Sequence, residues 1–322
     1  MKDKYSIVLD NHKKLTDLCG FNDSNLRLIE ELLGSHVYTI GNEIYFSSDN
    51  TEKQSQFYKI IEKLQEYTER GCTPGHDLIK GIFSSISYQQ INGVKEKIKD
   101  EIENLEIIIP GSSKRVYPKS YNQISLVKNF SDFDIIFAVG PAGTGKTYLA
   151  VARALSELLQ KKKRKLILTR PVVEAGESLG FLPGDLAQKI NPYLRPLYDA
   201  MESLIPFEMI AKLEETRAIE IAPLAYMRGR SLSDCFIILD EAQNTTKEQM
   251  KMFLTRISEG SRAIITGDIT QIDLPNKKQS GLIHAVNLLG SIKEIGFTFF
   301  SSEDVMRNPL IKKIIDAYEK EK

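Results

Sequence analysis

The stretch Gly140-Pro141-Ala142-Gly143-Thr144-Gly145-Lys146-Thr147 lies near the middle of this 322-residue chain. The stretch fits the phosphate-binding pattern G-x-x-x-x-G-K-[ST]. Residues 135–139 before it are apolar and predict a buried strand, and residues 148–159 after it predict a helix with one apolar face. Because the pattern needs a strand, a glycine-rich loop and a helix in this order, the sequence predicts a nucleoside triphosphate site.

The residues of this loop have distinct expected roles. The backbone N–H groups of the loop and the N-terminus of the following helix form a site for anions. Gly143 and Gly145 allow the backbone to approach a phosphate closely. Lys146 is expected to reach the β- and γ-phosphates, and Thr147 to place its hydroxyl on Mg²⁺. The expected ligands are therefore a nucleoside triphosphate and Mg²⁺.

Residues 121–322 alternate predicted strands with predicted helices. The apolar segments that predict strands are 135–139, 165–169, 218–222, 235–239, 262–266 and 295–300. Apolar strands separated by helices predict a mostly parallel sheet that is covered on both faces, so the expected fold class is α/β. The insertion at 172–217 is expected to be functional, because so long a loop-rich segment is uncommon in a compact domain.

Two of the predicted strands are followed by residues that can carry out chemistry. Asp240 and Glu241 follow strand 235–239. Asp240 is expected to hold Mg²⁺, and Glu241 to orient and deprotonate the attacking water. Strand 262–266 is followed by Gly267-Asp268 and then by Gln271, where a polar residue can sense the γ-phosphate or hold the water. Since the carboxyl ends of parallel strands meet where ligands bind, these residues should converge.

Phosphate transfer also needs positive charge in its transition state, and an arginine is the usual source. The candidates are Arg170, Arg228, Arg230 and Arg307. Arg170 ends a predicted strand, and Arg228 and Arg230 lie just before the acidic strand. Arg307 precedes an Asn-Pro pair that is typical of a helix start. The spacing does not choose among them.

Residues 1–105 are expected to form a separate small α/β domain, with a linker at 106–120. The pattern predicts a strand at 5–9, helices at 10–18, 23–33, 51–70 and 77–86, and a hairpin at 37–46. Residues 107–111 are predicted to be irregular because they end in Pro110-Gly111. Such a domain could bind RNA or dock a partner. The segment 19–22 lacks the G-x-x-G loop with which KH folds hold RNA, so the residues leave both roles open.

Composition limits the class of protein. Lys+Arg and Asp+Glu are equal at 43 each, so the total charge does not indicate a strongly basic nucleic-acid binder. The three cysteines form no C-x-x-C pair, so neither a disulfide framework nor a zinc site is expected. No signal core and no apolar run of about 18 residues is found, and we expect a cytoplasmic protein without a membrane span.

Several stretches together resemble the PhoH family of phosphate-loop ATPases, and in particular its YbeZ branch. They are residues 140–150, 169–185, 223–232, 237–246 and 267–275, which include Arg170-Pro171, Leu182-Pro183-Gly184-Asp185, Met227-Arg228-Gly229-Arg230 and Asp240-Glu241-Ala242-Gln243. This resemblance covers about residues 117–322. Residues 1–105 resemble the front domain of that branch, which is described as KH-like.

The resemblance implies more than the spacing does. It implies a RecA-like NTPase core, similar to the first motor domain of superfamily one helicases, and it places Arg170 among the nucleotide-binding residues. Asn122 and Gln123 match an adenine-reading motif, which would select ATP. Gln271, in Gly-Asp-x-x-Gln, matches a motif that links hydrolysis to nucleic acid. Family members are similar in forming hexameric rings, for which Arg307 is the first candidate to act in trans. Relatives of the branch are linked to RNA metabolism and to the endoribonuclease YbeY.

The leading hypothesis is therefore a Mg²⁺-dependent ATPase that couples hydrolysis to RNA remodelling or to delivery of RNA to a nuclease. Two alternatives stay open. A nucleotide-gated scaffold would use ATP binding to assemble a ring that docks a protein partner. A phosphotransferase would use the same loop, although Glu241 suits activation of water better than transfer to a bound hydroxyl.

Overall fold

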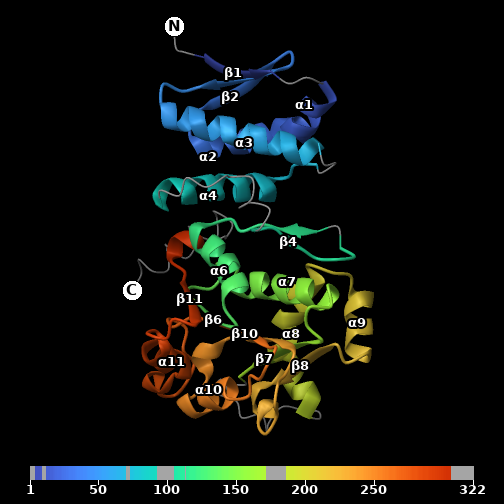
Figure 1. The fold of residues 1–322 in the computed structure, drawn as a ribbon, viewed down its shortest axis with the longest axis vertical. Helices are drawn as coiled ribbons and strands as arrows, with labels where there is room; N and C mark the ends of the chain where they lie inside the picture. The colour runs from blue at the N-terminus through green and yellow to red at the C-terminus, as the bar shows by residue number, and fades with distance from the viewer. Residues whose placement is uncertain are drawn as a thin grey trace. The chain divides into compact units, whose positions relative to one another are not determined.

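The computed structural model describes residues 4–8, 12–69, 73–92, 105–112, 114–171 and 186–305. The chain divides into two compact units, which are described separately (Figure 1). The first unit comprises Met1–Glu106 and Tyr117–Ile124, and the second comprises Ile107–Val116 and Ser125–Lys322. Within the described ranges, no helix combines the length and the hydrophobicity that spanning a bilayer requires.

The first unit is a three-stranded antiparallel sheet with helices packed on one face. Its elements are β1 (Lys4–Val8), α1 (His12–Cys19), η1 (Phe21–Asp23), α2 (Ser24–Leu33), β2 (His36–Ile40), β3 (Glu43–Ser47), α3 (Thr51–Glu69) and α4 (His76–Asn92). The strand order is β1-β3-β2, and the hairpin β2–β3 turns at Gly41, which has φ 61°. The predicted elements are confirmed, although α4 runs beyond the predicted end at residue 86. A KH-like fold for this unit stays a prediction.

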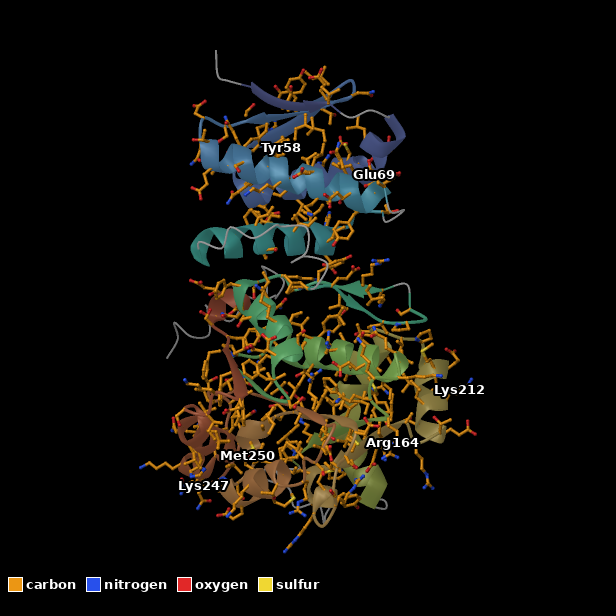
Figure 2. All side chains as sticks on the ribbon, viewed as in Figure 1. Tyr58, Glu69, Arg164, Lys212, Lys247 and Met250 are labelled. Carbon is orange, nitrogen blue, oxygen red and sulfur yellow. The ribbon has the colours of Figure 1, made fainter. Side chains whose placement is uncertain are left out.

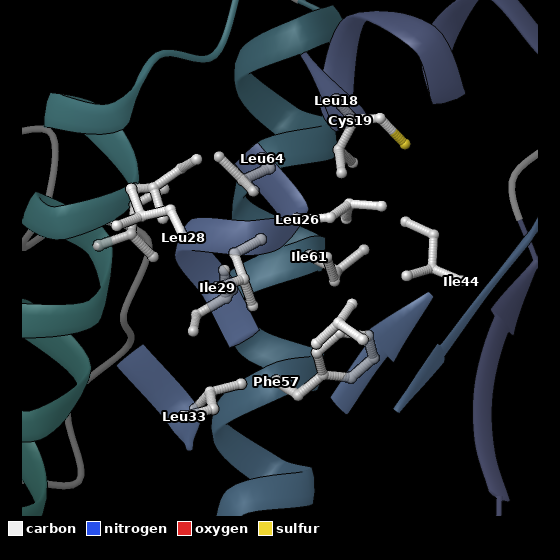
Figure 3. Packing of buried hydrophobic residues seen from close by; sticks show 14 of the residues in the cluster. Leu18, Cys19, Leu26, Leu28, Ile29, Leu33, Ile44, Phe57, Ile61 and Leu64 are labelled. Carbon is white, nitrogen blue, oxygen red and sulfur yellow. The ribbon is translucent and has the colours of Figure 1, made fainter. Parts of the chain in front are cut away.

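The core of the first unit joins the sheet to its helices. Figure 3 shows Ile44 of β3 facing the helical side chains of Ile29, Phe57 and Ile61, and none of the four has exposed surface. The rings of Phe46 and Phe57 stack with their centroids 4.7 Å apart. Full burial of such a side chain contributes about 1.5–3 kcal/mol, so this cluster accounts for the cohesion of the unit.

The second unit is built on a six-stranded sheet in which every neighbouring pair is parallel. The order across the sheet is β11-β6-β10-β9-β7-β8. The strands are β6 (Ile135–Val139), β7 (Lys165–Arg170), β8 (Ile219–Pro223), β9 (Cys235–Leu239), β10 (Arg262–Gly267) and β11 (Ile295–Phe299). Each predicted strand is confirmed to within one residue at either end, and so is the α/β class with its parallel sheet.

Helices cover both faces of this sheet (Figure 1). The helical elements from residue 121 onward are α6 (Tyr121–Asp132), α7 (Lys146–Leu159), α8 (Leu186–Glu202), α9 (Phe207–Glu215), η3 (Leu224–Met227), η4 (Ala242–Asn244), α10 (Lys247–Leu254), η5 (Lys277–Gln279), α11 (Gly281–Leu289) and η6 (Ser302–Asp304). Helices α10 and α11 cover one face, and α7 and α8 pack on β7 from the other. In α10, Met250 is buried toward the sheet while Lys247 points outward (Figure 2). Of the insertion at 172–217, the part up to residue 185 lies outside the described residues, and the rest forms α8 and α9.

The segment 107–116 corrects a prediction. Residues 107–111 are not irregular, because β4 (Ile107–Ile108) pairs antiparallel with β5 (Arg115–Val116). Pro110 and Gly111 form a turn within this hairpin, with Gly111 at φ 77°, rather than ending regular structure. Within the second unit, the hairpin is bonded to α7, since Ser156 Oγ donates a hydrogen bond to Ile108 O (2.6 Å). The predicted domain boundaries at 1–105, 106–120 and 121–322 stay predictions.

Candidate active site

The phosphate loop, residues 140–147, connects the carboxyl end of β6 to the first turn of α7. Gly143 and Gly145 have φ angles of 80° and 81°, in the left-handed region that side chains disfavour. Helix α7 begins directly after Gly145, so its N-terminal N–H groups open into the loop. The expected arrangement of strand, glycine loop and helix is therefore present, and it forms an anion site.

Gly140 is a glycine for a different reason, the close approach of neighbouring backbone. Its N–H donates to Gly267 O at the end of β10 (3.0 Å), and its φ is 151°. A Cβ at this position would lie 2.5 Å from the carbonyl oxygen of Phe300, just beyond β11. Glycine is required here because the backbones after three neighbouring strands come together at this point.

Lys146 is the buried cation of the site, with 7% of its surface exposed. Its Nζ donates to Gly140 O (2.7 Å), Pro141 O (2.6 Å) and Thr144 Oγ1 (3.2 Å). Burial lowers the pKa of Lys146, and nearby carboxylates raise it. Hydrogen bonds to the loop's own oxygens thus hold the ammonium at one end of the loop, where it can interact with phosphate.

Asp240, at the end of β9, has the contacts expected of a magnesium ligand. Its Oδ1 accepts hydrogen bonds from Thr147 Oγ1 of the loop (2.8 Å) and from Thr266 Oγ1 of β10 (2.6 Å). Carboxylate and hydroxyl oxygens suit Mg²⁺, which uses few protein ligands together with water and substrate phosphates. The hydroxyl of Thr147 and the carboxylate of Asp240, which lie within 2.8 Å of each other, therefore have the chemistry that fits Mg²⁺.

Glu241 follows Asp240 in an unusual backbone conformation. Its φ is 52°, which costs a residue other than glycine on the order of 1 kcal/mol or more. Its two carboxylate oxygens have different partners. Oε1 lies 3.2 Å from a guanidinium nitrogen of Arg170 at the end of β7, and Oε2 accepts a hydrogen bond from Gln243 Nε2. The strained bend and both contacts fix the direction of the carboxylate.

Gln243 connects the ends of β9 and β10. It has no exposed surface. Besides its bond to Glu241, its Nε2 donates to Gln271 O (3.1 Å), and its Oε1 accepts the N–H of Asp268 (3.0 Å). We call Glu241, Gln243, Asp268 and Gln271 the strand-end network. Every polar atom of the Gln243 amide is used in joining its members.

One pocket of about 270 Å³ brings the loop and the network together. It is lined by Ala142, Gly143, Gly145, Lys146, Thr147, Tyr148, Asp240, Glu241, Gly267, Asp268 and Gln271. The sequence-predicted convergence of Lys146, Thr147, Asp240, Glu241 and Gln271 is therefore present in the structure.

Other predicted residues have different places. Asn122 and Gln123 belong to the first compact unit, where Gln123 Oε1 accepts the N–H of Lys119 (2.6 Å), and their role as adenine readers stays a prediction. Arg230 forms two hydrogen bonds with Glu220 of β8 (2.5 and 2.9 Å), and Arg228 is exposed. Arg307 lies outside the described residues. Among the arginine candidates in the described ranges, Arg170 is the one in contact with a pocket residue.

Sequence reasoning missed Gln243 and Thr266 as parts of the site. Both are buried polar residues. Thr266 directly follows the apolar run at 263–265, whereas Gln243 lies beyond its strand, after Asp240, Glu241 and Ala242. Neither position says which strand end the side chain will meet, because that depends on strand order.

Comparison with known proteins places the chain in a family. A family model described as "PhoH-like protein" matches residues 115–319. A "PhoH-like protein" of Mycobacterium leprae (strain TN) is 45% identical over 94% of this chain and 84% of the relative. A "PhoH-like protein" of Bacillus subtilis (strain 168) is 44% identical over 97% of this chain and 96% of the relative.

Among solved structures, the Pif1 helicase from Candida albicans is similar at a TM-score of 0.31 and 14% identity, over 61% of this chain and 42% of that chain. So low a TM-score carries no argument about function. The family match, by contrast, spans more than half of the chain and includes the loop and the three acidic residues of the pocket, Asp240, Glu241 and Asp268. The chain belongs to the PhoH-like protein family and has the fold of a phosphate-loop NTPase.

Proposed function

We propose that this protein hydrolyses ATP in a Mg²⁺-dependent reaction. The observation that carries the proposal is the convergence of Lys146, Thr147, Asp240 and Glu241 on one pocket. These residue types match the roles of phosphate clamp, metal ligands and water-activating base in phosphate-loop hydrolases.

Each side chain has a specific task in this reaction. Lys146 Nζ stabilises the negative charge that develops on the transferred phosphoryl group. Thr147 and Asp240 would hold Mg²⁺, which neutralises charge on the β- and γ-phosphates when bound. Glu241 accepts a proton from the attacking water. The water oxygen bonds to the γ-phosphorus as the bond to the β–γ bridging oxygen breaks, giving ADP and inorganic phosphate.

In this scheme Arg170 can contact either the Glu241 carboxylate or a phosphate oxygen of the nucleotide. Its guanidinium lies against Glu241 at 3.2 Å, beside the pocket. An arginine in this place can transfer its contact from the carboxylate to a phosphate oxygen, which would supply positive charge and leave Glu241 better able to take a proton. Arg170 is therefore our candidate for a nucleotide-binding arginine supplied by the same chain.

We also propose that hydrolysis is coupled to RNA metabolism. The support is the resemblance of Gly267 to Gln271 to the Gly-Asp-x-x-Gln motif, together with the position of Gln271 at the pocket. The YbeZ branch, a hexameric ring with Arg307 acting in trans, a YbeY-type endoribonuclease as partner and a cytoplasmic location rest on resemblance or composition, and they are proposals of the same kind.

The proposal is tested by measuring phosphate release from ATP with the purified chain, with and without Mg²⁺ and single-stranded RNA. We expect Mg²⁺-dependent turnover that RNA stimulates and that Lys146→Ala abolishes. Turnover that RNA does not change would favour the nucleotide-gated scaffold with a protein partner. Absence of turnover, or turnover equal in Lys146→Ala, would refute ATP hydrolysis at this site.

A further inference from the structure

Asp268 contacts the phosphate loop, and none of the roles assigned so far explains this contact. It follows β10, and 5% of its surface is exposed. Its Oδ2 accepts the backbone N–H of Ala142 (3.1 Å), one of the N–H groups of the phosphate loop. Its Oδ1 accepts both the N–H and the hydroxyl of Thr270 (2.8 and 2.6 Å). Oδ1 thus anchors the carboxylate to Thr270, while Oδ2 contacts the phosphate loop.

The end of the loop that Asp268 contacts is the end where a terminal phosphate would bind. Ala142 directly follows Gly140 and Pro141, whose carbonyl oxygens bind Lys146 Nζ. In loops of this pattern the lysine reaches the β- and γ-phosphates, so its ammonium marks the terminal-phosphate end. Asp268 therefore bonds to the same end of the loop as the phosphate-binding cation.

We propose that Asp268 competes with the terminal phosphate of a bound nucleotide for the Ala142 N–H and for the field of Lys146. A triphosphate must displace the carboxylate, because two anions cannot share one N–H donor and one ammonium without strong repulsion. A diphosphate, which lacks the terminal group, leaves the carboxylate in place. Asp268 is in this way a specificity-determining residue that separates the two nucleotides, and this inference rests on the proposed use of ATP.

Displacement of Asp268 has a direct route to the hydrolytic carboxylate. The N–H of Asp268 donates to Gln243 Oε1 (3.0 Å), and Gln243 Nε2 donates to Glu241. A shift of the Asp268 backbone would disturb this amide, whose other bonds hold Glu241 and Gln271. Entry of a terminal phosphate would thus reorganise the network that directs Glu241.

The test is a comparison of nucleotide affinities. Dissociation constants for ADP and for a non-hydrolysable ATP analogue are measured calorimetrically in Mg²⁺ for the wild type and for Asp268→Asn, which keeps an acceptor but loses the charge. Removal of a like charge next to the phosphate should tighten binding of the analogue about tenfold relative to ADP. Asp268→Ser, which can still accept the Thr270 N–H, gives a second variant if the asparagine chain does not fold. Asp273→Asn is the control. It removes the same charge from a carboxylate that bonds to Asn244 Nδ2 (3.1 Å) and does not line the pocket.

The outcomes separate this inference from the proposed function. A selective gain for the triphosphate analogue in both Asp268 variants, absent in Asp273→Asn, supports the competition. An unchanged ratio of the two affinities, or an equal change in Asp273→Asn, overturns it even if the wild type hydrolyses ATP. If the selective gain occurs while the wild type releases no phosphate from ATP, the competition stands and ATP hydrolysis is refuted.

Discussion

The phosphate loop and the strand-end network form one pocket but are assembled in different ways. In the loop, Lys146 contacts residues two to six positions away, so its ammonium is held by the same eight-residue stretch that carries it. In the network, Gln243 reaches the segment after β10, with partners 25 and 28 positions away. The lysine is therefore held by local contacts, although Gly140 and Ala142 also bond to the segment at the end of β10. The network, by contrast, forms only if β9 and β10 are neighbours in register. This difference predicts which substitutions cause a large loss of turnover and which cause a small one.

A large loss of turnover is expected on substitution of Asp240, which bonds both to Thr147 of the loop and to Thr266 of β10. Asp240→Asn removes the charge that would hold Mg²⁺, so turnover should fall about 10²–10³-fold, since metal stabilisation is worth several kcal/mol in the transition state. The Mg²⁺ concentration for half-maximal rate should also rise. Both follow from phosphate release measured across a Mg²⁺ titration.

The matched control for Asp240→Asn is Asp234→Asn, just before the other end of β9. Asp234 is exposed and has φ 52°, a conformation that asparagine tolerates well. We expect near-normal turnover in this variant. An equal loss in both variants would mean that Asp240 acts only through general stability and not at the metal.

A smaller effect is expected within the network. Gln243→Met keeps the volume of the side chain but removes its hydrogen bonds, including the one to the Glu241 carboxylate. We expect kcat to fall roughly tenfold, because a hydrogen bond to a charged group is worth about 1.5–3 kcal/mol, with KM changed less than about threefold. Gln160→Met, at the exposed end of α7, is the control. A rise in KM at constant kcat would show that Gln243 supports binding rather than the position of Glu241.

The close packing around Gly267, where the network meets α11, gives a third prediction. A Cβ at Gly267 would lie 2.5 Å from Leu282 Cδ2 and 2.8 Å from Gln243 Oε1. Gly267→Ala should therefore destabilise the fold by about 1–3 kcal/mol, as overpacked cores do. In Gly75→Ala the added methyl meets nothing within 4 Å. Equal urea midpoints for the two variants would contradict the close approach.

The smallest effect is expected in an ion cluster outside the pocket. The hydrogen bond from Arg230 is the main cause that lowers the pKa of Glu220 from 4.5 to about 2, with Lys165 adding to it and burial opposing it. Because the folded pKa is the lower one, this stabilisation is complete above about pH 4.5 and is lost as pH falls toward 2. After allowance for partial exposure, Glu220→Gln should cost about 1 kcal/mol at pH 7 and nothing near pH 2. Unfolding free energies of both chains across this range test the sign, and a constant difference would refute it.

Much of this molecule could be predicted from its sequence, and the limits have physical reasons. The strands of the parallel sheet are continuous apolar runs, and the phosphate loop is a contiguous pattern, so both are visible locally. Thr266 and Gln243 were missed because their partners are set by strand order and register, which no local pattern records. The hairpin at 107–116 was missed because Pro110-Gly111 can end an element or turn it, and contact with Ser156 favours the turn.

The central claim is that Glu241 activates water at a site formed by the phosphate loop. Its most direct test is Glu241→Gln, measured by phosphate release from ATP alongside binding of a fluorescent nucleotide. We predict that turnover falls about 10²–10⁴-fold, the contribution of a general base, while the dissociation constant changes less than about threefold. Turnover that stays near the wild-type rate, with nucleotide still bound, would contradict the account.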